Sequence, residues 1–207
     1  MMPDAASAMD KAAPAREGRD AALVAALGAR SIVLIGMMAV GKSSIGKRLA
    51  ARLHLPFVDA DAEIELAAGM TIPEIFESHG EAYFRDGEAR VIARLLDSGP
   101  GVLSTGGGAF LREETRARVA QKGISLWIDA DPELILRRAR RRSDRPLLKT
   151  ANQAETIVKL LAERSPFYRL ADCKVMSRDV PHERIVEECV DTLYARLCGG
   201  GVDEGHA

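Results

Sequence analysis

The sequence predicts an α/β fold in which helices cover both faces of a parallel β-sheet. Short apolar runs rich in β-branched residues alternate with segments of helical apolar spacing, a pattern typical of parallel sheets. A glycine-rich segment, Gly36 to Ser43, directly follows the first apolar run and opens a helical pattern. The length of 207 residues fits one domain with terminal extensions.

Five strands are expected from the apolar runs. The run Ser31 to Ile35 is β-branched and ends at Gly36, so it indicates a buried strand. The other four are expected at residues 55–58, 101–104, 124–128 and 173–176. Ligands of such sheets bind at the carboxyl ends of the strands, which is where a site is expected.

The helices are expected between these strands. Ile45, Leu49 and Leu53 recur at helical spacing and predict a helix over residues 43–53. Thr71 and Glu74 form a capping-box pattern for a helix that begins at residue 72. The remaining helices are expected at residues 61–68, 72–79, 82–96, from 132 onward, 151–165 and 181–197.

The two ends of the chain are expected to lie outside the folded domain, which we place at residues 30–198. Residues 1–29 are rich in Ala, Asp and Arg and indicate a flexible extension. Residues 19–27 within it could form a short helix, because Leu23, Val24 and Leu27 share a face. Residues 199–207 are glycine-rich and indicate a flexible tail.

Composition excludes several classes of protein. A net charge of -1 creates no global field for nucleic acid or membranes, so neither is expected as a partner. Three cysteines without a C-x-x-C pair argue against a zinc site or a disulfide framework and favour a reducing compartment. Acidic residues near the N-terminus argue against a targeting peptide, and no apolar run approaches the ~18 residues of a membrane span. We therefore expect a cytoplasmic protein.

The glycine-rich segment fits the phosphate-binding pattern G-x-x-x-x-G-K-[ST]. Its backbone N–H groups and the following helix N-terminus suit the phosphates of ATP. Lys42 is expected to reach the β- and γ-phosphates, and Ser43 to hold Mg²⁺. The expected ATP-binding residues here are Gly36, Met37, Met38, Ala39, Val40, Gly41, Lys42, Ser43 and Ser44. The alternative is a glycine-rich turn without a ligand.

Other proteins with this loop fit less well than a small kinase. A GTPase switch needs an N-K-x-D segment to read guanine, and the sequence contains none. An ATPase motor is usually longer. The pattern therefore favours an enzyme that transfers the γ-phosphoryl group of ATP to a small molecule.

Asp59 and Asp61 stand at the end of the second expected strand. If the strand continues that far, alternation sends both carboxylates to one side. One can serve the Mg²⁺ shell, and the other can accept a hydrogen bond from a substrate hydroxyl. The alternative is that Asp61 only caps the next helix.

Three further features suit an anionic substrate. Arg85 and Glu88 are spaced so that Glu88 can orient the Arg85 fork, although a surface pair is the ordinary explanation. The run Gly106, Gly107 and Gly108 follows a strand and allows close approach to a ligand, unless it is a plain turn. Arg164 precedes a proline break, where a helix C-terminal charge is the alternative.

Residues 137–145 contain six arginines in nine positions. A basic loop over residues 138–150 that closes over ATP would exclude water and stabilise the γ-phosphate. A solvated basic surface is the alternative.

With these segments in this order, the sequence resembles shikimate kinases from about residue 31 to residue 197. The segments that carry the resemblance are the phosphate loop, Phe57-Val58-Asp59-Ala60-Asp61, Ala82-Tyr83-Phe84-Arg85 with Glu88, the Gly106 to Gly108 run, Arg145-Pro146-Leu147-Leu148 and Glu163-Arg164-Ser165-Pro166-Phe167-Tyr168.

The resemblance implies a P-loop fold like that of nucleoside monophosphate kinases, with a five-stranded parallel sheet. It implies phosphorylation of the 3-hydroxyl of shikimate, a step of chorismate and aromatic amino-acid synthesis. It places the shikimate-binding residues at Asp61, Arg85, Gly107 and Arg164, with Gly106 and Gly108 beside them.

The resemblance also implies roles at the nucleotide end. Lys42 and Arg145 would neutralise the transferring phosphoryl group, and Asp61 would accept the proton. Asp59 would assist Mg²⁺ through water. Arg138, within the arginine run, lies where the family has an arginine that contacts adenine.

Ala39 departs from the family, because many relatives have glycine there. Phosphate binding should survive unless the backbone torsion φ of this residue must be positive. Two rival functions remain: another small-metabolite kinase, such as a gluconate kinase, and a non-catalytic nucleotide-binding regulator. We expect a monomer that binds ATP and shikimate.

Overall fold

The computed structural model describes residues 5–140 and 152–199, and side chains from residue 16 onward. The expected loop over residues 138–150 and the expected tail therefore lie largely outside the described residues. So does Arg145.

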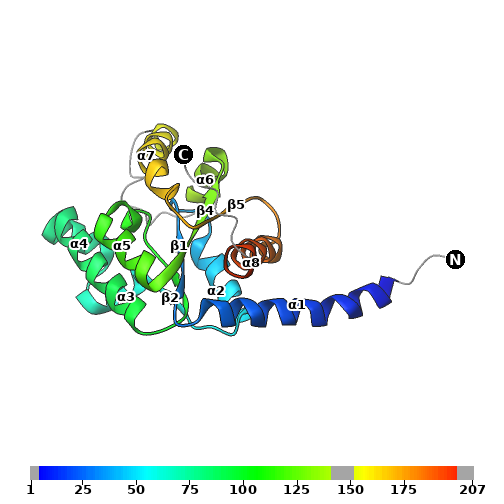
Figure 1. The fold of residues 1–207 in the computed structure, drawn as a ribbon. Helices are drawn as coiled ribbons and strands as arrows, with labels where there is room; N and C mark the ends of the chain where they lie inside the picture. Colours follow the sequence, from blue (N-terminus) through cyan, green and yellow to red (C-terminus); the bar gives the residue numbers. More distant parts are fainter. Residues whose placement is uncertain (1–4, 141–151, 200–207) are drawn as a thin grey trace, which may run out of the picture.

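A five-stranded parallel sheet forms the centre of the fold and confirms the predicted fold class (Figure 1). Its strands are β1 (Ser31–Ile35), β2 (Phe57–Asp59), β3 (Val102–Ser104), β4 (Gly123–Ala130) and β5 (Cys173–Ser177). Their order is β2-β3-β1-β4-β5, so β1 is the central strand. All five residues of β1 are buried, because both faces of the sheet are covered.

Helices cover the two faces of the sheet (Figure 1). They are α1 (Ala5–Leu27), α2 (Lys42–Arg52), α3 (Ala60–Ala68), α4 (Ile72–Asp97), α5 (Glu113–Lys122), α6 (Pro132–Ala139), α7 (Gln153–Tyr168) and α8 (His182–Cys198), with a 3₁₀ turn at Ala109–Leu111. Helices α2 and α8 pack against each other on one face, and α5 packs on β4 from the other. The loops after β1, β2 and β3 consequently meet at one edge of the sheet.

Two local predictions are refined by the structure. The predicted pair of helices over residues 72–96 forms one element, α4, broken at Gly80 where φ is 79° and ψ is 174°. Its capping box is confirmed: the Thr71 N–H donates to Glu74 Oε2 at 2.7 Å. No element was predicted between residues 109 and 122, where the structure has α5. This helix buries only Thr115 and Val119 and is otherwise strongly charged, so it lacks the apolar periodicity of a predicted helix.

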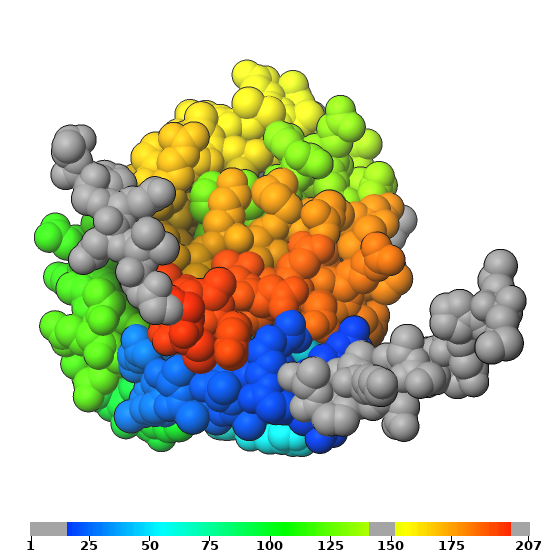
Figure 2. All heavy atoms as spheres, turned by 45° about the vertical axis from the view of Figure 1, so that its right-hand side comes forward, coloured from blue at the N-terminus to red at the C-terminus, as the bar shows by residue number. Residues whose placement is uncertain are grey.

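The expectation of a flexible extension over residues 1–29 needs correction for residues 5–27, whereas the short helix expected within residues 19–27 is confirmed. Residues 5–27 form α1, and its last turns pack on α8 (Figures 1 and 2). Leu23 and Leu27 are 0% and 1% exposed and belong to the main hydrophobic core. A short apolar stripe is enough here, because α8 supplies a surface that the sequence does not reveal. The folded unit therefore begins before residue 30.

Candidate active site

The phosphate loop connects β1 to α2 and has the tight curvature its glycines permit. Gly36 and Gly41 have φ of 131° and 103°, values that residues with a side chain rarely adopt. A Cβ at Gly36 would also lie 2.3 Å from the Ile128 carbonyl oxygen. Ala39 has φ of 63°, the positive value on which the effect of this departure from the family depends.

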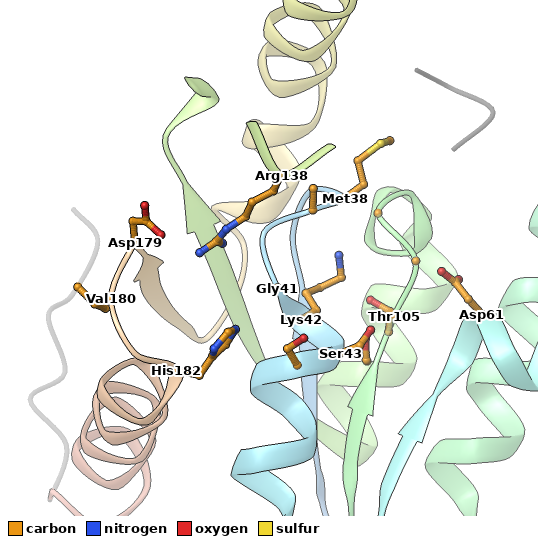
Figure 3. A pocket seen from close by; sticks show the side chains of 15 residues that line it. Met38, Gly41, Lys42, Ser43, Asp61, Thr105, Arg138, Asp179, Val180 and His182 are labelled. Carbon is orange, nitrogen blue, oxygen red and sulfur yellow. The ribbon is translucent and has the colours of Figure 1, made fainter. Parts of the chain in front are cut away.

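Lys42 lies at the first position of α2, beneath the curved loop (Figure 3). Its side chain is buried, and Nζ donates hydrogen bonds to the carbonyl oxygens of Gly36 and Met37 at 2.8 and 2.9 Å. The Lys42 ammonium group therefore lies inside the phosphate loop, as the position of Lys42 in the sequence motif predicted. A cation at a helix N-terminus inside such a loop is suited to bind phosphate.

Asp59 and Ser43 form the second part of the site. The Ser43 hydroxyl donates to Asp59 Oδ2 at 2.6 Å. Asp59 Oδ1 accepts from the Asp61 N–H at 3.1 Å, so Asp59 and not Asp61 caps α3. The alternative that Asp61 serves only as this cap is thereby removed, and its carboxylate lines two cavities instead.

The donor set at Ser43 and Asp59 fits a hydrated Mg²⁺ and not a protein-enclosed metal. Within the described residues, no three His, Cys, Asp or Glu side chains gather where they could hold a metal ion. Mg²⁺ usually takes one or two protein oxygens and keeps waters or substrate phosphates as its other ligands. A hydroxyl and a carboxylate in contact beside a phosphate loop match that requirement.

A cavity of about 420 Å³ lies over the phosphate loop (Figure 3). Arg138 lines it, and its Nη1 donates to the Val40 carbonyl at 3.0 Å and to Ser177 Oγ at 2.8 Å. Arg138 thus connects the phosphate loop to the end of β5. The far wall comes from residues that sequence reasoning missed: Asp179, Val180 and His182. They follow the carboxyl end of β5, so the rule that ligands bind at strand ends was the signal that could have found them.

A second cavity of about 520 Å³ lies between the glycine run and the helices α3 and α4. The two cavities share Met38, Ser43, Asp61, Gly106 and Gly107 as lining residues. They therefore meet at the Asp61 carboxylate. A phosphate chain in the first cavity and an acceptor in the second can react across this boundary.

The Arg85–Glu88 pair lies in the wall of the second cavity. Arg85 Nη1 donates to Glu88 Oε2 at 2.7 Å, and Glu88 is only 1% exposed. Burial raises the pKa of Glu88, and the adjacent Arg85 guanidinium opposes that rise. Such a buried pair holds the guanidinium in one direction, which an exposed surface pair would not do.

The three glycines leave room for the charged side chains that pack closely against them. A Cβ at Gly106 would lie 2.5 Å from Glu88 Oε1, and one at Gly107 would lie 3.1 Å from Arg164 Nη1. A Cβ at Gly108 would lie 2.6 Å from the Arg85 guanidinium. The glycine run therefore lets the charged groups of the second cavity pack directly against its backbone.

Arg164 reaches the same cavity from α7 and is 6% exposed. Tyr168, one turn later, donates its hydroxyl to the Gly107 carbonyl, an anchor that sequence reasoning did not assign. Burial raises the pKa of Tyr168 to about 12, so this hydroxyl remains a donor at neutral pH. Arg85 and Arg164 thus place two guanidinium groups around one cavity, as an anionic ligand requires.

Comparison of the sequence with known proteins gives the same family as the resemblance noted above. A sequence model of the shikimate kinase family matches residues 38–194. A shikimate kinase of Bradyrhizobium diazoefficiens is 67% identical over 92% of both chains, and one of Rhodopseudomonas palustris is 62% identical over 95% of this chain and 97% of the relative.

Comparison with solved structures gives the same family. A shikimate kinase from Acinetobacter baumannii in complex with shikimate has a TM-score of 0.77 at 33% identity, and covers 84% of this chain and 96% of its own. A gluconokinase from Sinorhizobium meliloti shares the fold alone, with a TM-score of 0.54 at 19% identity over 86% of this chain and 98% of its own.

Proposed function

This chain belongs to the shikimate kinase family, and we propose that its two joined cavities bind ATP and shikimate for transfer of the γ-phosphoryl group to the 3-hydroxyl. One observation supports this most directly: the phosphate-loop cavity and the cavity with two arginines meet at Asp61. Shikimate carries one carboxylate and three hydroxyls, so it needs a cationic clamp and a hydroxyl acceptor, and the second cavity contains both.

The residues around the phosphate loop would bind the triphosphate. The loop N–H groups and the Lys42 ammonium neutralise its charge, which is the main requirement of phosphoryl transfer. Mg²⁺, held by Ser43 and through water by Asp59, would add charge neutralisation at the β- and γ-phosphates. Arg145 keeps its expected role at the γ-phosphate as a proposal, because it lies outside the described residues.

The second cavity would orient shikimate. Arg85, fixed by Glu88, and Arg164 bind the carboxylate, which leaves the ring hydroxyls facing Asp61 and the glycine run. Asp61 accepts the hydrogen bond of the acceptor hydroxyl and takes its proton as the new bond to phosphorus forms and the bond between the γ-phosphorus and ADP breaks. Positioning of the hydroxyl against the γ-phosphate supplies much of the remaining acceleration.

The adenine would lie at the far end of the first cavity, between Arg138 and the segment after β5. Val180 and His182 provide apolar and ring surface there.

None of the helices in the described parts is long and apolar enough to cross a membrane. We also propose that the protein is a cytoplasmic monomer. Its near-neutral net charge creates no global field for nucleic acid or membranes, which supports small-molecule partners alone.

A coupled ADP-release assay over a panel of hydroxy acids tests the proposed substrate. The purified protein with Mg²⁺ and ATP should release ADP fastest with shikimate. Faster turnover of gluconate would assign the chain to the chemistry of the gluconokinases, whose fold it shares. Binding of ATP without turnover of any acceptor would favour a non-catalytic regulator.

The substitution Asp61→Asn tests the mechanism. It keeps the shape of the side chain and removes its charge and proton acceptor, so kcat should fall by roughly 10²-fold or more. The affinity for ATP should change little, because the phosphates are bound by other residues. Unaltered turnover would remove Asp61 from the mechanism.

A further inference from the structure

Five charged side chains connect α1 to α2 and α8, on the side of these helices away from the active site. We call them the α1–α2–α8 charge cluster; they are Arg19, Asp20, Arg52, Glu187 and Asp191. Arg52 is at its centre. Its Nε and Nη2 donate to the two carboxylate oxygens of Asp20 at 2.7 and 3.1 Å, and its Nη1 donates to Glu187 Oε2 at 2.6 Å.

Helix α1 contributes two side chains, Arg19 and Asp20, to this cluster. Arg19 donates to both Glu187 and Asp191 of α8. Leu23 and Leu27, on the following turns of α1, are completely buried in the core. Because the side chains of Arg19, Asp20 and Arg52 are at most 23% exposed, these ion pairs are less screened by water than surface pairs.

The two helices that α1 connects both begin at the nucleotide cavity. Helix α2 starts at Lys42, directly after the phosphate loop, and α8 starts at His182, in the opposite wall. A second ion pair links these helices closer to the site, with Arg48 Nε 3.5 Å from Glu183 Oε1. Because α2 and α8 begin at opposite walls of the nucleotide cavity, a change in the distance between them would change the width of the cavity.

We propose that α1 is a brace that fixes α8 against α2 and thereby sets the affinity of the site for adenine nucleotides. Arg19, Asp20 and Arg52 are positioning residues in this proposal, since none of them lines the cavity. The proposal rests on the proposed function only in taking this cavity as the nucleotide site. Arg19 and Asp20 lie before residue 38, where the match to the family model begins.

Two variants test the brace. The first deletes residues 1–27. The second, Arg19→Met with Asp20→Asn, keeps Leu23, Leu27 and the helix and removes only the charges that α1 contributes. Arg118→Met is the matched control, because Arg118 also joins two helices through an ion pair, with Asp97 of α4, but has no part in α2 or α8.

The primary measurement is the Kd for ADP by isothermal titration calorimetry, followed by the KM values for ATP and shikimate. ADP binding needs no shikimate, so the result is independent of whether shikimate is the acceptor. We expect the deletion to raise the Kd for ADP and the KM for ATP by about 5- to 30-fold, the scale of coupling through packed elements. The KM for shikimate should stay within twofold, and the double variant should show a smaller rise of about two- to fivefold.

A purely structural role for α1 predicts a different result. The thermal midpoint of unfolding would fall, and both Kd for ADP and KM for ATP would match those of the wild type and of Arg118→Met at a temperature where all are folded. That result in the double variant overturns the proposal, even if the deletion variant does not fold. An equal rise in the KM for ATP and for shikimate also overturns it, because the brace acts only on the nucleotide wall.

Discussion

Substitution of Gly108 by alanine tests whether the glycine run supports Arg85, the arginine that we propose binds shikimate. Gly108 has φ of -101°, which alanine adopts without strain, so only the added methyl group matters. That methyl carbon would lie 2.6 Å from Cζ and both Nη atoms of Arg85. The guanidinium must then move by about 0.8 Å to reach an ordinary contact near 3.4 Å.

The size of the effect follows from what this movement breaks. A shift of this size directed away from Glu88 would take the 2.7 Å bond between Arg85 and Glu88 past 3.2 Å, the outer limit of a good hydrogen bond. Hydrogen bonds between charged groups contribute about 1.5–3 kcal/mol, and each 1.4 kcal/mol corresponds to a tenfold change. We therefore expect kcat/KM for shikimate to fall by about 10- to 100-fold.

The ADP-release assay, with shikimate and ATP varied in turn, measures this directly. The KM for ATP should stay within twofold, because Gly108 lines only the second cavity. Gly87→Ala is the matched control, since a Cβ there meets nothing within 4 Å. Wild-type kcat/KM for shikimate in Gly108→Ala would refute the role of the glycine run, and an equal loss in Gly87→Ala would show a general effect on α4.

Three further predictions concern other parts of the molecule. Ala39→Gly should raise the free energy of unfolding by about 0.5–1 kcal/mol, because relief of the strain at φ of 63° exceeds the cost of glycine flexibility; chemical denaturation measures it, and a loss of stability would contradict it. Glu187→Gln should lower the free energy of unfolding at pH 7 by about 1–2 kcal/mol. The Arg52 and Arg19 guanidinium groups lower the pKa of Glu187 to about 2, so its stabilisation is complete above the ordinary value of 4.5 and is lost as pH falls toward 2. The difference from wild type should shrink over that range, and a constant difference would contradict the ion pairing. Arg145→Ala should reduce kcat far more than it weakens ADP binding, because ADP lacks the γ-phosphate; little effect on either would leave the basic segment as a charged surface.

Much of the site was predictable because local sequence dictates it. The glycines, Lys42 and Ser43 of the phosphate loop form their site within one strand-to-helix turn, so their spacing alone specified the geometry. The same holds for the capping box at Thr71 and Glu74. By contrast, the cap of α3 was not predicted. Asp61 was considered as this cap only as an alternative, and the structure has Asp59 there, because strand β2 ends one residue later than the apolar run suggested.

Other features depend on contacts between distant segments. The pattern of residues 1–29 resembles a free extension, because only Leu23, Val24 and Leu27 mark an apolar face and the partners of Arg19 lie on α8. Likewise, α5 has almost no apolar periodicity and is stabilised by its packing on β4 and α4. Asp179, Val180 and His182 carry no motif and enter the nucleotide cavity only because β5 ends beside the phosphate loop.

The sequence by itself determined the fold class and the phosphate loop, since each follows from short-range spacing, and its resemblance to the family indicated the charged residues that we propose around the substrate. The tertiary structure alone decided that Arg85, Arg164 and Asp61 meet over three glycines, and that α1 joins the core. The physical reason is that these contacts link residues up to 172 positions apart, and their free energy depends on burial and on partner charges that no local pattern contains.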